Sequence, residues 1–99
     1  MTKQLSVLAV VTAACLALPA HAADADAAQA LAKKSGCMKC HSVAAKKEGP
    51  SFKDVAAKYK GKADAEQMLV AKLTSGKGHP ATKASAADVK SIVQWVLAQ

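Results

Sequence analysis

The stretch SGCMKCH, residues 35–41, places two cysteines three positions apart, with a histidine directly after the second cysteine. Thiol and imidazole side chains bind metals and form covalent bonds, so this spacing restricts what the chain can hold. The identity of the group held by Cys37, Cys40 and His41 decides how the remainder of the sequence is to be understood.

Three common uses of paired cysteines fit this stretch poorly. A structural disulfide between Cys37 and Cys40 would not require His41. A thioredoxin-like dithiol needs a βαβ context, and the chain shows no alternating strand pattern. A zinc site needs four ligands, and no second Cys/His pair follows at ligand spacing.

The pattern C-x-x-C-H is typical of covalent c-type haem attachment. The two thiols add to the two haem vinyl groups, and the adjacent histidine comes to lie beneath the iron. We therefore predict one haem c bound through Cys37 and Cys40, with a disulfide or another metal as the remaining alternatives.

The first 22 of the 99 residues have the pattern of a cleavable export signal. Lys3 precedes an apolar run over residues 5–18, and residues 20–22 match an A-x-A cleavage site. We therefore predict a signal peptide over residues 1–22, one mature domain over residues 23–99, and export to the periplasm, with no membrane span after cleavage.

Two alternatives for this segment stay open. An uncleaved anchor is one, because the apolar run continues weakly beyond Leu18. A lipoprotein signal through Cys15 is the other, although the usual leucine does not precede that cysteine. If the signal is cleaved, Cys15 and His21 leave with it, and neither belongs to a site.

The mature chain has few large side chains with which to build a core. It contains one Phe, one Tyr and one Trp, and much of its apolar content is alanine. Domains of this size often depend on a disulfide, metal or cofactor for stability. A haem would supply the missing bulk.

The charge of the chain excludes little by itself. All 14 basic residues are lysines, and without Lys3 the remaining 13 face seven acidic residues, for a net charge of about +6. Nucleic acid is disfavoured as a partner because the chain has no arginine, few aromatics for stacking and an export signal. Most of the scattered lysines are expected to form a solvated surface.

The mature sequence predicts an all-α fold. Glycines, capping residues and apolar periodicity place four helices, at residues 24–34, 50–59, 63–75 and 85–97. Asp64 is expected to cap the third helix and Ser85 the fourth. In the last helix Val89, Ile92, Val93 and Val96 follow the i, i+3, i+4, i+7 spacing of a buried face.

Together these segments resemble the small class I monohaem cytochromes c of bacterial periplasms. The resemblance rests on GCMKCH at residues 36–41, GPSFKDVAAKY at residues 49–59 and QWVL at residues 94–97, and it covers nearly all of the mature chain. It implies about four helices wrapped around one covalently attached haem, with the N- and C-terminal helices crossing near Leu31 and the valine-rich face of the last helix.

The resemblance also implies roles for individual residues. His41 would be the proximal iron ligand, and the Pro50 carbonyl would accept a hydrogen bond from its other ring nitrogen. Phe52, Tyr59 and Trp95 would pack around the haem and its propionates, although plain core packing is an equally good explanation for these aromatics.

The sequence departs from that family at the sixth iron ligand. The family usually supplies a methionine from a loop before the last helix, and residues 76–85 contain none. Met38 lies in the attachment motif itself, and Met68 lies among apolar residues of the third helix, where a core role is expected.

His79 is the predicted sixth ligand in place of methionine. It lies in this loop beside two glycines that allow close approach to a porphyrin, and Pro80 favours an extended backbone before it. Met68 is a weaker candidate. A five-coordinate iron, or ligation by Lys77 or Lys83 at higher pH, stays possible.

Two strong axial ligands leave no position for a substrate, so the sequence predicts a one-electron carrier and not an enzyme. Lysines near the haem edge would dock a dehydrogenase or reductase through weak, salt-sensitive contacts; the candidates are Lys39, Lys46, Lys47 and Lys77. Nothing in the sequence demands an oligomer, so we expect a monomer.

Two other haem functions compete with this interpretation. The chain could bind gases or other small ligands at a sixth position that is open or that opens on reduction. A peroxidase has little support, because no distal acid/base pair accompanies His79.

Overall fold

The computed structural model describes residues 14 and 20–99, with side chains for residues 14 and 24–99. The elements in chain order are α1 (Ala20–Lys34), the 3₁₀ turn η1 (Cys37–Lys39), α2 (Phe52–Tyr59), α3 (Ala65–Ser75) and α4 (Ala86–Leu97). No β-strand occurs in this part of the chain. The predicted all-α fold with four helices is confirmed.

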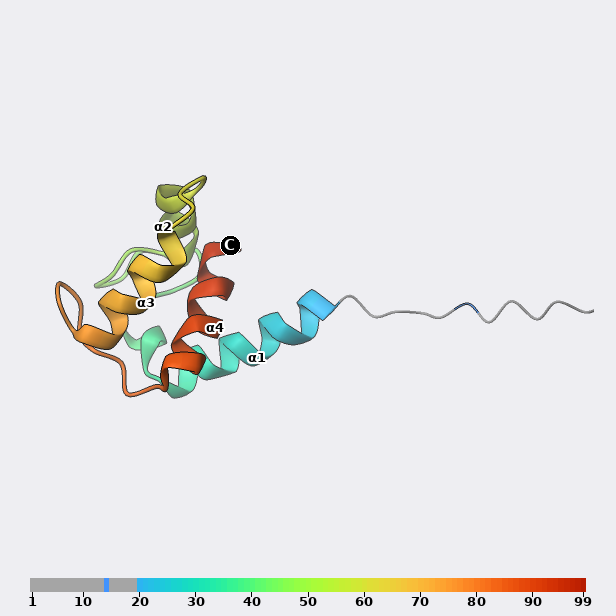
Figure 1. Ribbon diagram of the computed structural model, residues 1–99, viewed down its shortest axis with the longest axis horizontal. Helices are drawn as coiled ribbons and strands as arrows, with labels where there is room; N and C mark the ends of the chain where they lie inside the picture. Colours follow the sequence, from blue (N-terminus) through green and yellow to red (C-terminus); the bar gives the residue numbers. More distant parts are fainter. Residues whose placement is uncertain (1–13, 15–19) are drawn as a thin grey trace, which may run out of the picture.

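Helix α4 is the centre of the fold. It packs against each of the other three helices, and α1 crosses it as expected for the terminal helices (Figure 1). The segment between α1 and α2 and the loop between α3 and α4 are both irregular. These two loops carry His41 and His79, so the arrangement of the helices decides where the two histidines lie.

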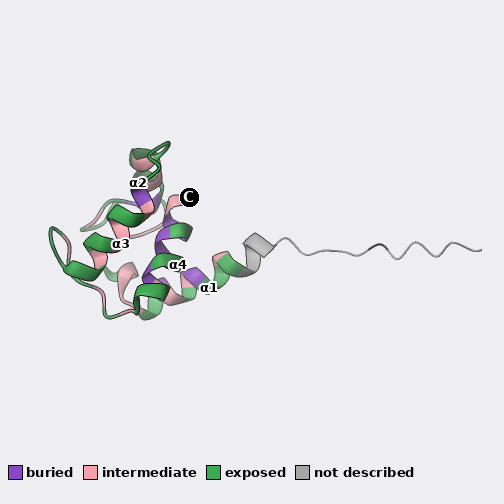
Figure 2. Ribbon diagram, viewed as in Figure 1, coloured by how far each residue is buried: buried purple, intermediate pink, exposed green. Residues whose placement is uncertain are grey.

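The core forms where α4 meets α1 and α2. The predicted face of α4 is buried, including Val89 and Val93, and Figure 2 shows buried segments on α4 and on the helices beside it. Helix α1 contributes Ala28 and Ala32, whose small side chains allow α1 to approach α4 closely. Leu31 packs against the same cluster, as predicted.

Helix α1 begins earlier than predicted, at Ala20 instead of Asp24. Residues 20–23 are alanine-rich in sequence and contain no helix breaker. The predicted signal peptide and Cys15 fall almost entirely outside the described residues and stay predictions. In the described part of the chain, no helix has the length and apolar character needed to cross a membrane.

Two serines cap helices. The Ser85 hydroxyl accepts a hydrogen bond from the Asp88 N–H at 3.2 Å, which confirms the predicted cap of α4, and Ser51 does the same for Asp54 at 3.1 Å. The predicted cap by Asp64 is wrong, because its side chain makes no such bond. Asp64 has a ψ of 5°, whereas a capping residue needs an extended backbone to reach the first turn.

This difference predicts unequal effects of two matched substitutions. We expect Ser85→Ala to lower the free energy of unfolding of the holoprotein by about 1 kcal/mol, because the Asp88 N–H loses its partner. Asp64→Ala should change the same quantity by less than about 0.5 kcal/mol. Urea titration followed by circular dichroism measures both; an equal loss in the two variants would contradict the assignment of the caps.

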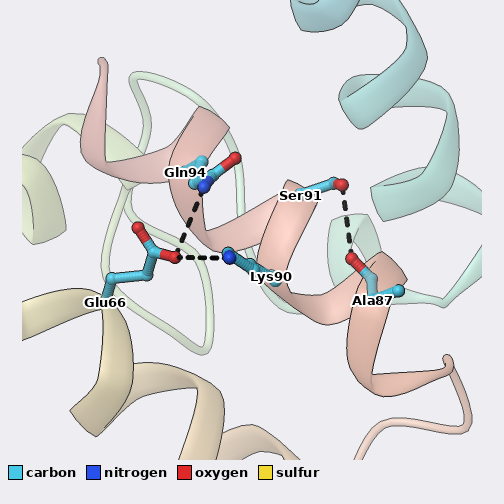
Figure 3. Close-up of polar contacts among 5 residues, drawn as sticks. All are labelled: Glu66, Ala87, Lys90, Ser91 and Gln94. Atoms are coloured by element: carbon cyan, nitrogen blue, oxygen red, sulfur yellow. Dashed lines mark hydrogen bonds and ion pairs between the residues drawn. The ribbon is translucent and has the colours of Figure 1, made fainter.

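Helix α3 is joined to α4 by a polar contact at the surface (Figure 3). The Gln94 side-chain amide donates to Glu66 Oε1 at 3.3 Å, and the Lys90 ammonium lies 3.9 Å from the same oxygen. Exposed pairs of this kind contribute little stability. Their consequence here is that the Glu66 carboxylate is already engaged.

Candidate haem-binding site

The two cysteines and His41 lie on a tight turn at the end of α1. Gly36 adopts a φ of 81°, which ends the helix in a conformation that glycine tolerates without strain. The turn closes through hydrogen bonds from the Cys40 and His41 N–H groups to the Cys37 carbonyl, at 3.3 and 3.0 Å. Both thiols and the imidazole are thereby held on one short segment.

A crevice opens between this turn, the α3–α4 loop and the face of α4. It consists of two cavities of about 390 and 300 Å³, each within the usual range for ligand sites. The residues that line both cavities are Cys37, His41, Pro50, Leu73, Gly78, His79 and Ile92. We call this space the haem crevice.

The walls of the haem crevice are largely apolar. Each of the helices α2, α3 and α4 contributes side chains to them, namely Phe52, Val55, Leu69, Leu73, Val89, Ile92, Val93 and Val96. An apolar ring system in the crevice would cover the partly buried Val55, Leu69 and Leu73 and would extend the core formed by the other five.

The orientation of His41 is fixed by its neighbours. Its Nδ1 lies 2.7 Å from the Pro50 carbonyl oxygen, which is the hydrogen bond expected from the sequence. A carbonyl can only accept, so Nδ1 carries the proton and Nε2 of the neutral ring keeps its lone pair for a metal. The ring also stacks on Phe52, with centroids 5.1 Å apart.

Gly49 shapes the same site, and sequence reasoning did not identify its role. A side-chain carbon added at Gly49 would lie only 2.7 Å from His41 Nδ1 and 2.9 Å from Nε2. The imidazole therefore occupies the space that any other residue at this position would need. The sequence signal was the glycine directly before Pro50, but nothing local related it to His41.

We expect Gly49→Ala to displace the His41 ring and to destabilise the holoprotein by about 1–3 kcal/mol, as overpacking does. Gly61→Ala is the control, because Gly61 has a positive φ but nothing within 4 Å of the added carbon. Only the Gly49 variant should change the visible haem spectrum. An unchanged spectrum in Gly49→Ala, measured beside thermal unfolding, would show that the loop yields instead of the imidazole.

His79 lies across the haem crevice from His41. The two ring centroids are 5.9 Å apart and the ring planes differ by 9°. Both rings line both cavities of the crevice. The Nδ1 of His79 is engaged by the Pro80 carbonyl at 2.8 Å, so its Nε2 is the ring nitrogen that this contact leaves free.

The loop that carries His79 depends on two glycines in the left-handed region. Gly76 and Gly78 have φ of 74° and 73°, and Gly76 ends α3. The Thr82 N–H donates to the Leu73 carbonyl at 2.9 Å, so the loop closes on the helix it leaves. This short closure directs His79 into the crevice.

The thiols of Cys37 and Cys40 are both free, as covalent attachment requires. Cys37 is half-buried, and burial raises the pKa of its thiol, partly offset by a backbone hydrogen bond. Cys40 is exposed, and its thiol donates to the Glu48 carboxylate at 3.5 Å. Within the described residues no cluster of three His, Cys, Asp or Glu side chains could hold a metal ion.

Two residues predicted for the site lie elsewhere. Trp95 lines neither cavity of the haem crevice; it is 9% exposed and packs edge-on behind Phe52 at 5.3 Å. Met68 is 47% exposed and lines neither cavity, so the expectation that it belongs to the core is wrong, and its weaker candidacy as an iron ligand gains no support. Helical periodicity leaves the rotation of α3 open, and packing turns Leu69 and Leu73 inward instead.

The other predicted residues meet as expected, and two lysines join them. Phe52 and Tyr59 line the haem crevice, as do Lys58 and Lys72. Sequence reasoning assigned neither lysine to the crevice, because a lysine on a short helix gives no local sign of the direction it faces.

The arrangement fits a covalently attached haem. Two free thiols, an imidazole with its Nδ1 held by a carbonyl, and apolar walls converge on one crevice. A model of the cytochrome c family matches residues 25–99. The chain belongs to the cytochrome c family.

Individual relatives agree with this assignment. Cytochrome c-551 of Allochromatium vinosum is 49% identical over 75 residues, which cover 68% of this chain and 80% of the relative. Cytochrome c-552 of Hydrogenobacter thermophilus is 40% identical over 74 residues, covering 68% and 76%. The crystal structure of the class 1 cytochrome MtoD from Sideroxydans lithotrophicus ES-1 has a TM-score of 0.66 and 45% identity, covering 76% of this chain and 95% of that one.

Several predictions from the sequence are thereby confirmed. This small class I cytochrome c has an all-α fold and carries one haem c, bound covalently through Cys37 and Cys40. Its function is electron transport and not enzymatic catalysis.

Proposed function

We propose that this cytochrome c is a periplasmic one-electron carrier whose haem iron is held between His41 and His79. The observation that carries the proposal is the pairing of the two imidazoles across the haem crevice, at a centroid separation of 5.9 Å and with nearly parallel planes. Bound haem supplies a single redox change, between ferric and ferrous iron.

The hydrogen bonds of the two histidines support this ligand pair. Each Nδ1 is engaged by a proline carbonyl, at 2.7 Å for His41 and 2.8 Å for His79, so each ring offers Nε2. The two carbonyls fix the tautomers and increase the basicity of the ligating nitrogens. Met68, the methionine weighed as an alternative, lines neither cavity of the crevice.

The ligand pair has a consequence for the reduction potential. An imidazole donates to ferric iron more strongly than a thioether does, so a His/His haem has a lower potential than a His/Met haem in comparable surroundings. A carrier of this kind would accept electrons from stronger reductants than a His/Met carrier does.

The surface around the crevice mouth supports docking to acidic redox proteins, such as a periplasmic dehydrogenase or reductase. Lys39, Lys46 and Lys77 are exposed. Lys47 is exposed as well, although its ammonium donates to the Met38 carbonyl at 2.8 Å. Lysines at such an edge steer association at low salt more than they add affinity. The predicted export signal supports the periplasmic location, and a monomer suffices for this function.

The test is a low-temperature EPR spectrum of the ferric holoprotein together with carbon monoxide binding by the ferrous holoprotein. We expect a low-spin bis-imidazole signal, a one-electron redox wave and weak carbon monoxide binding, because both axial positions are occupied. The competing function as a binder of small ligands predicts tight carbon monoxide binding. A high-spin ferric signal would overturn the assignment of His79.

A further inference from the structure

The corner between α2 and α3 carries a groove outside the haem crevice. A cavity of about 650 Å³ lies between residues 53–66 and the C-terminal end of α4. We call it the corner groove. Three exposed lysines line it, Lys53, Lys60 and Lys62, and its acidic side chain is Glu66.

The corner groove is effectively cationic. Its three lysines outnumber the single acidic side chain, Glu66, which is itself in contact with the Lys90 ammonium at 3.9 Å and the Gln94 amide at 3.3 Å (Figure 3). Within the described residues, none of the three groove lysines forms an ion pair. A partner that brings carboxylates would meet ammonium groups that form no ion pair within the described chain.

Tyr59 connects the corner groove to the haem crevice. It lines the groove, and it also lines the crevice cavity that contains His41 and His79. No other described residue lines both spaces. One aromatic ring therefore separates the cofactor site from a basic surface.

Two lysines hold this ring. The Lys58 ammonium lies 5.6 Å from the ring centroid and the Lys62 ammonium 5.3 Å, both within cation–π range. Lys58 lines the crevice and Lys62 lines the groove. Two nearby positive charges oppose the removal of an electron from the ring. We therefore expect an electron to tunnel across the Tyr59 ring without oxidising it.

We propose that the corner groove is a second docking port, in which an acidic redox protein places carboxylates against Lys53, Lys60 and Lys62 and exchanges one electron with the haem across Tyr59. This inference rests on the proposed function. One electron leaves the reduced metal centre of the partner and converts ferric to ferrous haem iron; no bond forms or breaks and no proton is transferred.

The shape of the groove favours a protein over a membrane as the occupant. A concave space of about 650 Å³ admits protruding acidic side chains, whereas a flat lipid surface could not reach its walls. With one port at the crevice mouth and one at this corner, the carrier could contact a donor and an acceptor through different faces.

The test uses ferrous holoprotein oxidised by hexacyanoferrate(III), an anionic one-electron probe, in a stopped-flow experiment. The variant Lys60→Gln/Lys62→Gln is compared with Lys33→Gln/Lys34→Gln, which removes the same charge from exposed positions at the end of α1. We expect the groove variant to react about tenfold more slowly at low ionic strength and the control less than about twofold more slowly. High salt should remove the difference.

A second measurement examines the ring and the acidic partner. Tyr59→Leu should react more slowly than Tyr59→Phe, and the spectrum and reduction potential of each variant are measured beside its rate because Tyr59 also lines the haem crevice. A hexaglutamate peptide should slow the wild type and leave the groove variant unaffected.

Two outcomes would overturn the port. Equal slowing in the two lysine pairs would show a general charge effect, and a wild-type rate in Tyr59→Leu would exclude the route across the ring. If the wild type did not cycle between ferric and ferrous states, the proposed function itself would be wrong. If the wild type cycles and all variants react at its rate, only the proposed docking port is wrong.

Discussion

Replacing Cys37 and Cys40 together by alanine is expected to remove the covalent haem and, with it, the folded state of the domain. Among the residues whose burial is described, the core contains nine apolar residues, three of them alanine. Val55, Leu69 and Leu73 line the haem crevice and are only partly buried by the polypeptide, so without haem their remaining apolar surface would stay in contact with water. A domain of this size has no second source of stability to replace that burial.

Far-UV circular dichroism and haem staining of the denatured protein measure the two effects. The double variant should lose most of its helical signal and all of its covalently bound haem. Lys39→Gln, at an exposed position inside the same motif, is the control and should keep both. A double variant that retains a cooperative thermal transition would show that alanine packing between α1 and α4 is sufficient for the fold.

Replacing His79 by alanine is expected to convert a low-spin ferric haem into a high-spin one. In the proposed site, His41 keeps its hydrogen bond to Pro50, whereas the opposite side of the crevice loses its only imidazole. The ferrous variant should then bind carbon monoxide tightly. EPR and a carbon monoxide titration of the holoprotein measure these changes.

The His79→Met variant separates ligation from a merely structural effect. A thioether in place of the imidazole should restore a low-spin haem and raise the potential by an amount on the order of 0.1 V. Lys77→Ala and Lys83→Ala should leave the spectrum of the wild type unchanged at neutral pH. If either lysine variant became high-spin and His79→Ala did not, the sixth ligand would be that lysine.

Several elements of the fold were predictable because their signals are local. The Ser85 cap, the buried face of α4 and the glycine stops after α1 and α3 each depend on residues within one or two turns. The predicted cap by Asp64 was wrong because the backbone of Asp64 has a ψ of 5°, which the local sequence pattern does not reveal. Helix α1 likewise extends further because alanines alone give no boundary.

The haem site likewise has features that local sequence predicts and features that depend on contacts between distant residues. A covalent motif is contiguous, so the spacing of Cys37, Cys40 and His41 alone predicted the cofactor, and the missing loop methionine directed attention to His79. Other features of the site depend on contacts between residues that are distant along the chain. These are the proximity of His79 to His41, the contact of Gly49 with the His41 imidazole and the packing of Trp95 against Phe52. Those required the packed structure.

The sequence by itself therefore determined the fold class and the covalent haem, because both depend on residues that are neighbours along the chain. Only the tertiary structure decided which sides of α2 and α3 face inward. It turned Leu69 and Leu73 toward the haem crevice and Met68 toward solvent, and it brought Tyr59 between the crevice and the corner groove. Helical periodicity defines the relative positions of side chains around an axis, whereas the rotation of that axis is set by packing against α4.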